Sequence, residues 1–312
     1  MARISLWLRR GWRRLSFLAM RSLVRATGFA RVRRLGQSIG DLQFRLAWSE
    51  RRRQAHDIAL VLGRPTDDPS VRTLLHQAYR VNTVAVLETL AMFDRHQDER
   101  MLASQCEVEG LHQLHAALEG GRGAILLGAH MGNGAMLIVQ LACSGLPVSV
   151  VYRQSRMMSA GFFDRGLTLY GIEGILANEG FRAYVRMVDA LRRGRIVFLT
   201  MDQGTKYAQD GIVMPFLGKE MPMSAGPAQL ARLSGAPLLP VVTTASDPVW
   251  RFTIEAPVPR TAGATLASDV EKLARVTERQ VLQYPHLWSW HHRRWCKYPF
   301  TPSTGNSVST LR

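Results

Sequence analysis

The spacing of the apolar positions changes about a third of the way along the chain. Up to about residue 120, apolar and polar residues mix at the three-to-four-residue spacing of amphipathic helices, as in the stretch 71–95, without a strong strand signal. Beyond residue 121, short apolar runs separated by helix-like segments replace this pattern. The first part of the chain is therefore predicted to be helical.

The second part of the chain is predicted to alternate strands and helices. Helix-like segments such as 181–193 and 225–234 separate most of the short apolar runs, which lie at 124–127, 148–152, 196–201, 237–243 and 252–254. Such alternation is typical of a parallel sheet covered by helices. We predict an α/β fold with a mostly parallel central sheet flanked by helices.

One long stretch could be mistaken for a membrane span. Between Arg122 and Arg153 the chain contains no Asp, Glu, Lys or Arg. Glycine and proline interrupt it repeatedly, at residues such as Gly132, Gly145 and Pro147. We interpret it as a buried strand, a loop, a helix, a turn and a second buried strand.

The N-terminal segment is predicted to be a basic amphipathic helix. Residues 1–35 contain ten arginines, and no acid precedes Asp41. On a helical wheel, one arc holds Arg3, Arg10, Arg14, Arg21 and Arg25, and another holds Ile4, Leu8, Trp12, Leu15, Leu18 and Leu23. This pattern favours a helix lying in a membrane interface. Arginines interrupt it too often for a spanning helix or a cleavable signal. The alternative is a basic face packed on the domain.

The chain is predicted to contain a basic membrane-associating segment (1–40), one large domain (41–300) and a flexible tail (301–312). Its 312 residues include 40 basic and 24 acidic ones, a net charge of +16. Such a surplus indicates nucleic acid or an anionic membrane as partner. Because much of it lies on the amphipathic helix, we predict an anionic membrane surface and no nucleic acid. The three cysteines are widely spaced, so we predict neither a disulfide framework nor a zinc site. The lack of a disulfide framework also favours a domain that faces the cytoplasm.

Three predicted strands end in residues that could carry chemistry. His130 follows the run at 124–127, Arg153 follows 148–152, and Asp202 follows 196–201. Catalytic groups gather at the carboxyl ends of parallel strands, where a neutral His could accept a proton and Arg could bind a phosphate. Each residue also has a structural alternative: a hydrogen-bonded turn His, a strand-capping Arg, and an Asp that forms a turn.

The segment 285–295 interleaves aromatic residues with His and Arg, including Arg293 and Arg294. This composition suits a lipid interface or a phosphorylated sugar, and alone it would equally suit nucleic acid. Cations repel a metal ion and no carboxylate or cysteine is adjacent in the segment, so no metal site is predicted there.

Taken together, four ordered segments resemble the bacterial lipid A biosynthesis (lauroyl/myristoyl) acyltransferase family, within the lysophospholipid acyltransferases. The resemblance covers roughly residues 51–300. Its segments are Gly-Ala-His130-Met-Gly-Asn133, Tyr152-Arg153, Asp202-Gln203 with Pro215-Phe-Leu-Gly218 and Gly226-Pro-Ala228, and Trp288-Ser-Trp-His-His-Arg-Arg-Trp295. Each is weak alone, but their order and spacing make the match specific.

The resemblance implies a membrane-associated enzyme on the cytoplasmic face of a bacterial inner membrane. It would move a fatty-acyl chain from acyl carrier protein or acyl-CoA to a hydroxyl of a glycolipid such as a lipid A precursor, without a cofactor. His130 would be the general base, Arg153 would neutralise a phosphate, and the substrate would contact Gly132, Asn133, Gln203, Arg293 and Arg294.

The sequence departs from the family pattern at Ala135, where the family carries the acid that orients its His. Losing such a carboxylate in a triad-type site can cost about 10⁴ in rate. Three explanations are open. Another acid could replace it, with Asp202 first and Glu173 or Glu179 behind it. His130 could act alone, or the protein could be a catalytically impaired lipid-binding relative.

Overall fold

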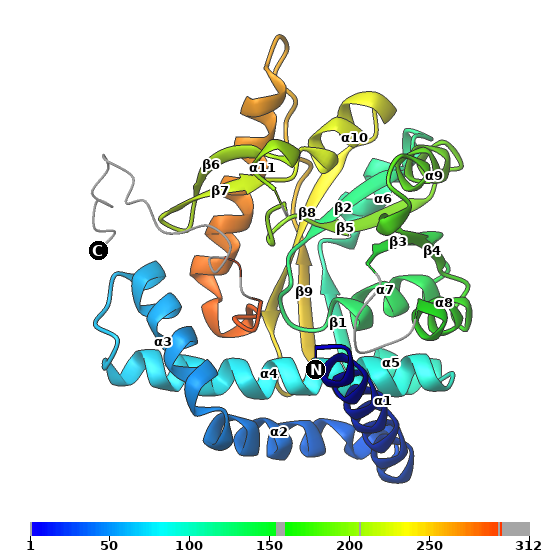
Figure 1. Ribbon diagram of the computed structural model, residues 1–312. Helices are drawn as coiled ribbons and strands as arrows, with labels where there is room; N and C mark the ends of the chain where they lie inside the picture. The colour runs from blue at the N-terminus through cyan, green and yellow to red at the C-terminus, as the bar shows by residue number, and fades with distance from the viewer. Residues whose placement is uncertain (1, 154–159, 206, 293, 295–312) are drawn as a thin grey trace.

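The computed structural model describes residues 2–153, 160–205, 207–292 and 294, with side chains from Leu15 onward in the first helix. The predicted tail at 301–312 and Arg293 lie outside the described residues. A central sheet carries helices on its faces, and the N-terminal helices form a layer along one edge of it (Figure 1).

The sheet has seven strands in the order β1-β9-β8-β2-β5-β3-β4. All neighbouring pairs are parallel except β8 with β9. The prediction of a mostly parallel sheet is therefore confirmed. The strands are β1 (Cys106–Glu109), β2 (Ala124–Gly128), β3 (Val148–Tyr152), β4 (Glu173–Leu176), β5 (Ile196–Thr200), β8 (Leu238–Ala245) and β9 (Trp250–Ile254).

The sequence patterns missed the shortest strands. β1 and β4 have four residues each and form the two edges of the sheet, and β1 carries two exposed or half-buried acids rather than an apolar run. A separate antiparallel hairpin, β6 (Ile212–Phe216) and β7 (Lys219–Met223), was also missed, because each of its strands contains a proline.

Eleven α-helices lie within the described residues. They are α1 (Ala2–Thr27), α2 (Phe29–Leu46), α3 (Trp48–Leu62), α4 (Pro69–Asp94), α5 (Glu99–Ala103), α6 (Leu111–Glu119), α7 (Gly134–Cys143), α8 (Ala160–Thr168), α9 (Phe181–Arg192), α10 (Gly226–Ser234) and α11 (Leu266–Gln283). Short 3₁₀ turns η1 (Ala177–Glu179), η2 (Ala208–Asp210) and η3 (Pro285–Leu287) complete the chain.

Two glycines one turn apart allow α2 to pack closely on α4. A Cβ atom at Gly36 would lie 2.8 Å from Val84 Cα, and one at Gly40 would lie 2.8 Å from Arg80 Cα. Such close backbone approach excludes larger residues at these positions. The boundary predicted at residue 40 lies inside α2, in the middle of this contact.

One side of the described part of α1 packs on the domain, where Val24 is buried and the Phe17 ring lies 5.3 Å from that of Phe162. Arg21 and Arg25 both form ion pairs with Asp94 at the end of α4. Leu15, Leu18 and Leu23 are 63, 44 and 42 % exposed. Apolar residues and two arginines of this part of α1 therefore contact the domain, and three of its leucines are left uncovered.

The uncharged stretch between Arg122 and Arg153 folds as predicted, into β2, a loop, α7, a turn and β3. Among the described helices, none combines the length and the apolar character that a membrane crossing requires. Cys106 and Cys143 are free thiols.

Candidate active site

Strand register brings His130 and Asp202 together. β2 pairs with β5 in parallel, with Gly128 opposite Thr200. His130 and Asp202 each follow their strand by two residues, so both side chains emerge side by side at the carboxyl edge of the sheet. His130 Nδ1 lies 2.7 Å from Asp202 Oδ1.

Asp202 is fully buried and held by three side chains. Besides His130, its Oδ2 accepts hydrogen bonds from Trp288 Nε1 at 2.8 Å and Arg294 Nη2 at 2.7 Å. Burial alone raises the pKa of Asp202, but the charges of His130 and Arg294 and their hydrogen bonds outweigh it and hold that pKa well below its usual value. Asp202 is therefore a carboxylate at neutral pH.

The C-terminal segment locks the His130 loop from the other side. Ser289 N donates to His130 O at 2.8 Å, and Met131 and Trp288 form an antiparallel bridge. Arg294 lies 3.6 Å from the centre of the Trp288 ring and also donates to the backbone oxygen of Asp202. The first and last of the four segments that carry the family resemblance, which contain His130 and Trp288, therefore both contact the Asp202 carboxylate.

The second ring nitrogen of His130 faces a polar, accessible space. The His130 side chain is 35 % exposed. Because Nδ1 carries the proton that Asp202 accepts, Nε2 is an acceptor, and the exposed Gln203 side chain donates to it over 2.9 Å. Gln203 Nε2 also lies 3.1 Å from His292 Nδ1, and the His130 and His292 rings are 4.7 Å apart. Burial, together with the charge of His130, lowers the pKa of His292 to about 3, so His292 is neutral beside His130.

Asn133 lies below the site rather than in it. It is 1 % exposed, caps α7 by accepting from Met136 N at 3.1 Å, and donates to Glu88 Oε2 at 2.9 Å. Glu88, on α4, also accepts from Trp250 and pairs with Arg33 at 3.2 Å. Sequence reasoning missed Glu88, although a lone acid among the apolar residues of a helix was a usable signal.

Gly132 allows the loop its close packing. Its φ is +56°, and a Cβ there would lie 2.6 Å from Thr243 Cγ2. The left-handed backbone and this contact both require glycine. The groups closest to Gly132 belong to Thr243 and Trp250, and its N–H donates to Leu287 O at 2.8 Å.

The remaining predicted residues occupy different positions. Arg153 is exposed and follows β3, which pairs with β5, so it lies on the same edge of the sheet as Asp202. The Arg294 side chain is 1 % exposed and contacts Asp202, Trp288 and Ser289, so it lies beneath the site instead of facing solvent. Arg293 lies outside the described residues.

The other acids considered as partners of His130 are engaged elsewhere. Glu173 begins β4 opposite Ser149, at the far edge of the sheet, and pairs with Arg193 at 2.8 Å. Glu179 is 3.8 Å from Arg186. Ala135 stands in the first turn of α7. Among the described carboxylates, Asp202 is the one within hydrogen-bonding distance of His130.

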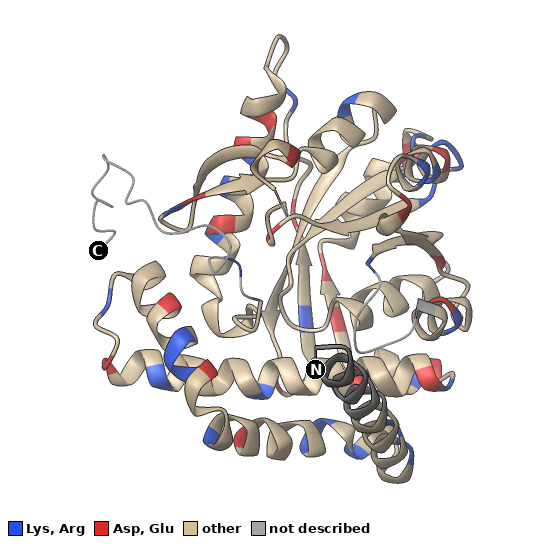
Figure 2. Ribbon diagram, in the orientation of Figure 1, with Lys and Arg blue, Asp and Glu red and all other residues tan. Residues whose placement is uncertain are grey.

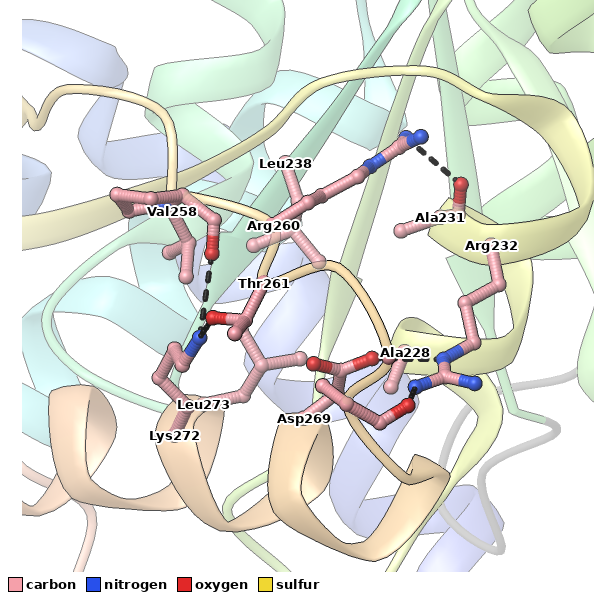
Figure 3. Close-up of a pocket in the computed structure, with 13 residues that line it drawn as sticks. Ala228, Ala231, Arg232, Leu238, Val258, Arg260, Thr261, Asp269, Lys272 and Leu273 are labelled. Atoms are coloured by element: carbon pink, nitrogen blue, oxygen red, sulfur yellow. Dashed lines mark hydrogen bonds and ion pairs between the residues drawn. The ribbon is translucent and has the colours of Figure 1, made fainter.

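A pocket of about 210 Å³ lies away from His130 and Asp202 (Figure 3). Leu238, at the amino end of β8, lines it. Its charged groups already have partners: Arg232 Nε donates to Asp269 Oδ2 at 2.6 Å, and Lys272 Nζ donates to the Thr261 hydroxyl at 2.9 Å. We therefore assign no substrate to this pocket. The described residues contain no group of three or more His, Cys, Asp or Glu that could hold a metal ion.

Comparison with known proteins assigns the family. The model of the family described as "Bacterial lipid A biosynthesis acyltransferase" matches residues 5–297. The chain belongs to this family. The match extends further toward the N-terminus than residues 51–300, and it takes in α1 and α2.

Curated relatives are named phosphatidylinositol mannoside acyltransferase. One from Mycobacterium tuberculosis is 29 % identical over 205 residues, which cover 64 % of this chain and 63 % of the relative. One from Mycolicibacterium smegmatis is 26 % identical over 202 residues, with 64 % and 65 % covered. The chain thus spans less than two thirds of the length of these relatives.

Proposed function

We propose that this member of the family transfers a fatty-acyl group to a hydroxyl of a glycolipid, with His130 as general base and Asp202 in place of the acid missing at Ala135. The observation that carries the proposal is the hydrogen bond between His130 Nδ1 and the buried Asp202 carboxylate at 2.7 Å. It fixes the tautomer that leaves Nε2 free to accept a proton.

In this reaction the acceptor hydroxyl donates its proton to His130 Nε2 while its oxygen attacks the carbonyl carbon of an acyl thioester. The C–S bond then breaks, and the thiolate leaves with the proton from His130. Asp202 stabilises the imidazolium that exists between these steps. Gln203 Nε2, 2.9 Å from His130 Nε2, occupies the place where the acceptor hydroxyl would bind, so the acceptor displaces it.

The buried Arg294 and Trp288 serve as positioning residues. Each donates to Asp202 Oδ2, leaving Oδ1 for His130. Asn133 positions the loop by capping α7. Arg153, exposed on the same edge of the sheet, is placed to neutralise a phosphate of donor or acceptor. No cofactor enters this chemistry.

The acceptor is proposed to be a phosphate-bearing glycolipid, a lipid A precursor or a lipid of the phosphatidylinositol mannoside kind, and the donor an acyl carrier protein or acyl-CoA thioester. The relatives' names and the family description support this class. The exposed leucines of α1 support action at a membrane surface. We propose that this surface is anionic and is the cytoplasmic face of a bacterial inner membrane.

Transfer of labelled acyl chains from acyl carrier protein to extracted lipids tests the roles of His130 and Asp202. We expect His130→Ala and Asp202→Asn each to lower kcat/KM by about 10³–10⁴. His112→Ala is the control, because His112 is an exposed histidine on α6, the helix that leads into the amino end of β2, whereas His130 follows its carboxyl end.

The outcome separates catalysis from lipid binding alone. If the wild type binds lipid but shows no turnover, or if His130→Ala transfers label as fast as His112→Ala, the base assignment is wrong. Circular dichroism of each variant shows whether a loss of activity follows a loss of fold.

A further inference from the structure

The corner between α2 and α3 exposes three large apolar side chains. Leu42, Leu46 and Trp48 are 53, 74 and 60 % exposed. Leu42 and Leu46 lie one turn apart on α2, and Trp48 begins α3 only one residue beyond the end of α2. Single exposed apolar residues are ordinary, but three within seven residues mark a contact surface.

A basic cavity of about 510 Å³ opens beside this corner. It is lined by Arg51, Arg52, His56 and Arg72 together with Phe44, Ala55, Thr66, Asp67, Asp68 and Leu75. The Asp68 carboxylate caps α4 at Ser70 N, 2.8 Å away, and Arg51 Nη1 donates to Phe44 O at 2.7 Å. Two further guanidinium groups, of Arg52 and Arg72, then stand against one further carboxylate, that of Asp67. The cavity therefore suits an anion better than a cation.

The apolar and basic parts of the corner are joined. The Arg52 guanidinium lies 4.9 Å from the centre of the Trp48 ring, and the Arg51 guanidinium lies 4.9 Å from that of Phe44. Aromatic and apolar groups next to arginine are typical of the depth in a membrane where acyl chains give way to headgroups. Figure 2 shows basic positions on α3 and on the part of α4 beside it.

A row of rings leads from the cavity to the candidate active site. Phe44, in the cavity wall, contacts Tyr79 at 5.6 Å between ring centres, and Tyr79 contacts His291 at 4.7 Å. The next residue, His292, is in ring contact with His130. A lipid held at the corner would thus lie on the same side of the domain as the site.

We infer that the α2–α3 corner, formed by Leu42, Leu46, Trp48 and the cavity beside them, is a second membrane contact, distinct from residues 1–40. Its apolar side chains enter the acyl region, and Arg52 and Arg72 bind the phosphate of an anionic phospholipid. The inference rests on the proposed action at a membrane. It gives that action a fixed orientation, with the α2–α3 corner turned toward the lipid.

Co-sedimentation of the full chain with lipid vesicles tests this surface. We expect Leu46→Ser combined with Trp48→Ser to weaken partition onto phosphatidylglycerol–phosphatidylcholine vesicles about tenfold or more. Arg52→Gln combined with Arg72→Gln should weaken partition onto these vesicles about tenfold or more and leave partition onto pure phosphatidylcholine within about twofold.

The matched control is Phe181→Ser combined with Val185→Ser on α9, because these residues are 80 and 50 % exposed and α9 lies on the opposite side of the molecule (Figure 1). It should partition as the wild type does. The inference is overturned if the corner variant stays within about twofold of the wild type, or if the α9 variant loses as much. His130→Ala separates the two proposals: retained turnover overturns the base assignment, whereas its vesicle partition should equal that of the wild type, because the corner is unchanged.

Discussion

Replacing Arg294 by methionine tests whether the buried arginine keeps Asp202 ionised. The Arg294 and Asp202 side chains are 1 % and 0 % exposed and 2.7 Å apart. Removing one partner of a buried ion pair costs about 3–5 kcal/mol, because the other charge is left without its counterion. At about 2.1 cal/mol/K of unfolding entropy per residue, that loss corresponds to a fall of about 5–8 °C in Tm for a domain of this size.

The effect should depend on pH in a defined direction. Since the pKa of Asp202 is held well below its usual value, ionised Asp202 stabilises the fold above about pH 5, and this contribution is lost as pH falls through the lowered pKa. Without Arg294, burial raises the Asp202 pKa. The gap in Tm between wild type and Arg294→Met should therefore be widest near neutral pH and narrow on acidification, and the acid limb of kcat/KM should move to higher pH.

Thermal unfolding followed by circular dichroism and a pH–rate profile measure both effects. Arg251→Met is the control, because Arg251 lies 2.7 Å from Glu107 but their side chains are 44 and 55 % exposed. It should cost no more than about 1 kcal/mol. Equal Tm values for the two variants, with an unmoved acid limb, would refute the role given to Arg294.

Three further predictions follow from single contacts. Asn133→Ala should lower the free energy of unfolding by about 1–3 kcal/mol in chemical denaturation, because α7 loses its cap and Glu88 a buried hydrogen bond. Gly36→Leu should separate α2 from α4 and lower Tm, since Val84 Cα leaves no space for a Cβ, whereas Gly63→Ala, in open space, should cost only the strain of its positive φ. Arg153→Gln should raise KM for a phosphate-bearing acceptor with little change in kcat, and an unchanged KM would contradict its phosphate role.

Local pattern was enough to predict much of the fold. The apolar runs at 124–127, 148–152 and 196–201 became β2, β3 and β5 within one residue at each end, because a strand buried on both faces leaves a continuous apolar run. The glycines and the proline between Arg122 and Arg153 correctly favoured strand, helix and strand over a membrane span.

The short edge strands could not be predicted in the same way. β1 and β4 have only four residues each. They are strands because they pair with β9 and β3, and not because of a long apolar run of their own. The helical prediction up to residue 120 therefore failed at Cys106–Glu109.

The sequence by itself determined which residues stand at the ends of buried strands, and so it nominated His130, Arg153 and Asp202. Only the tertiary structure decided which of them meet. The register of β2 against β5 set His130 beside Asp202, and the return of the C-terminal segment buried Arg294 under that carboxylate. The physical reason is that strand order and register depend on packing between segments far apart in the chain. The apolar pattern that predicts a strand, by contrast, depends only on the residues of that strand.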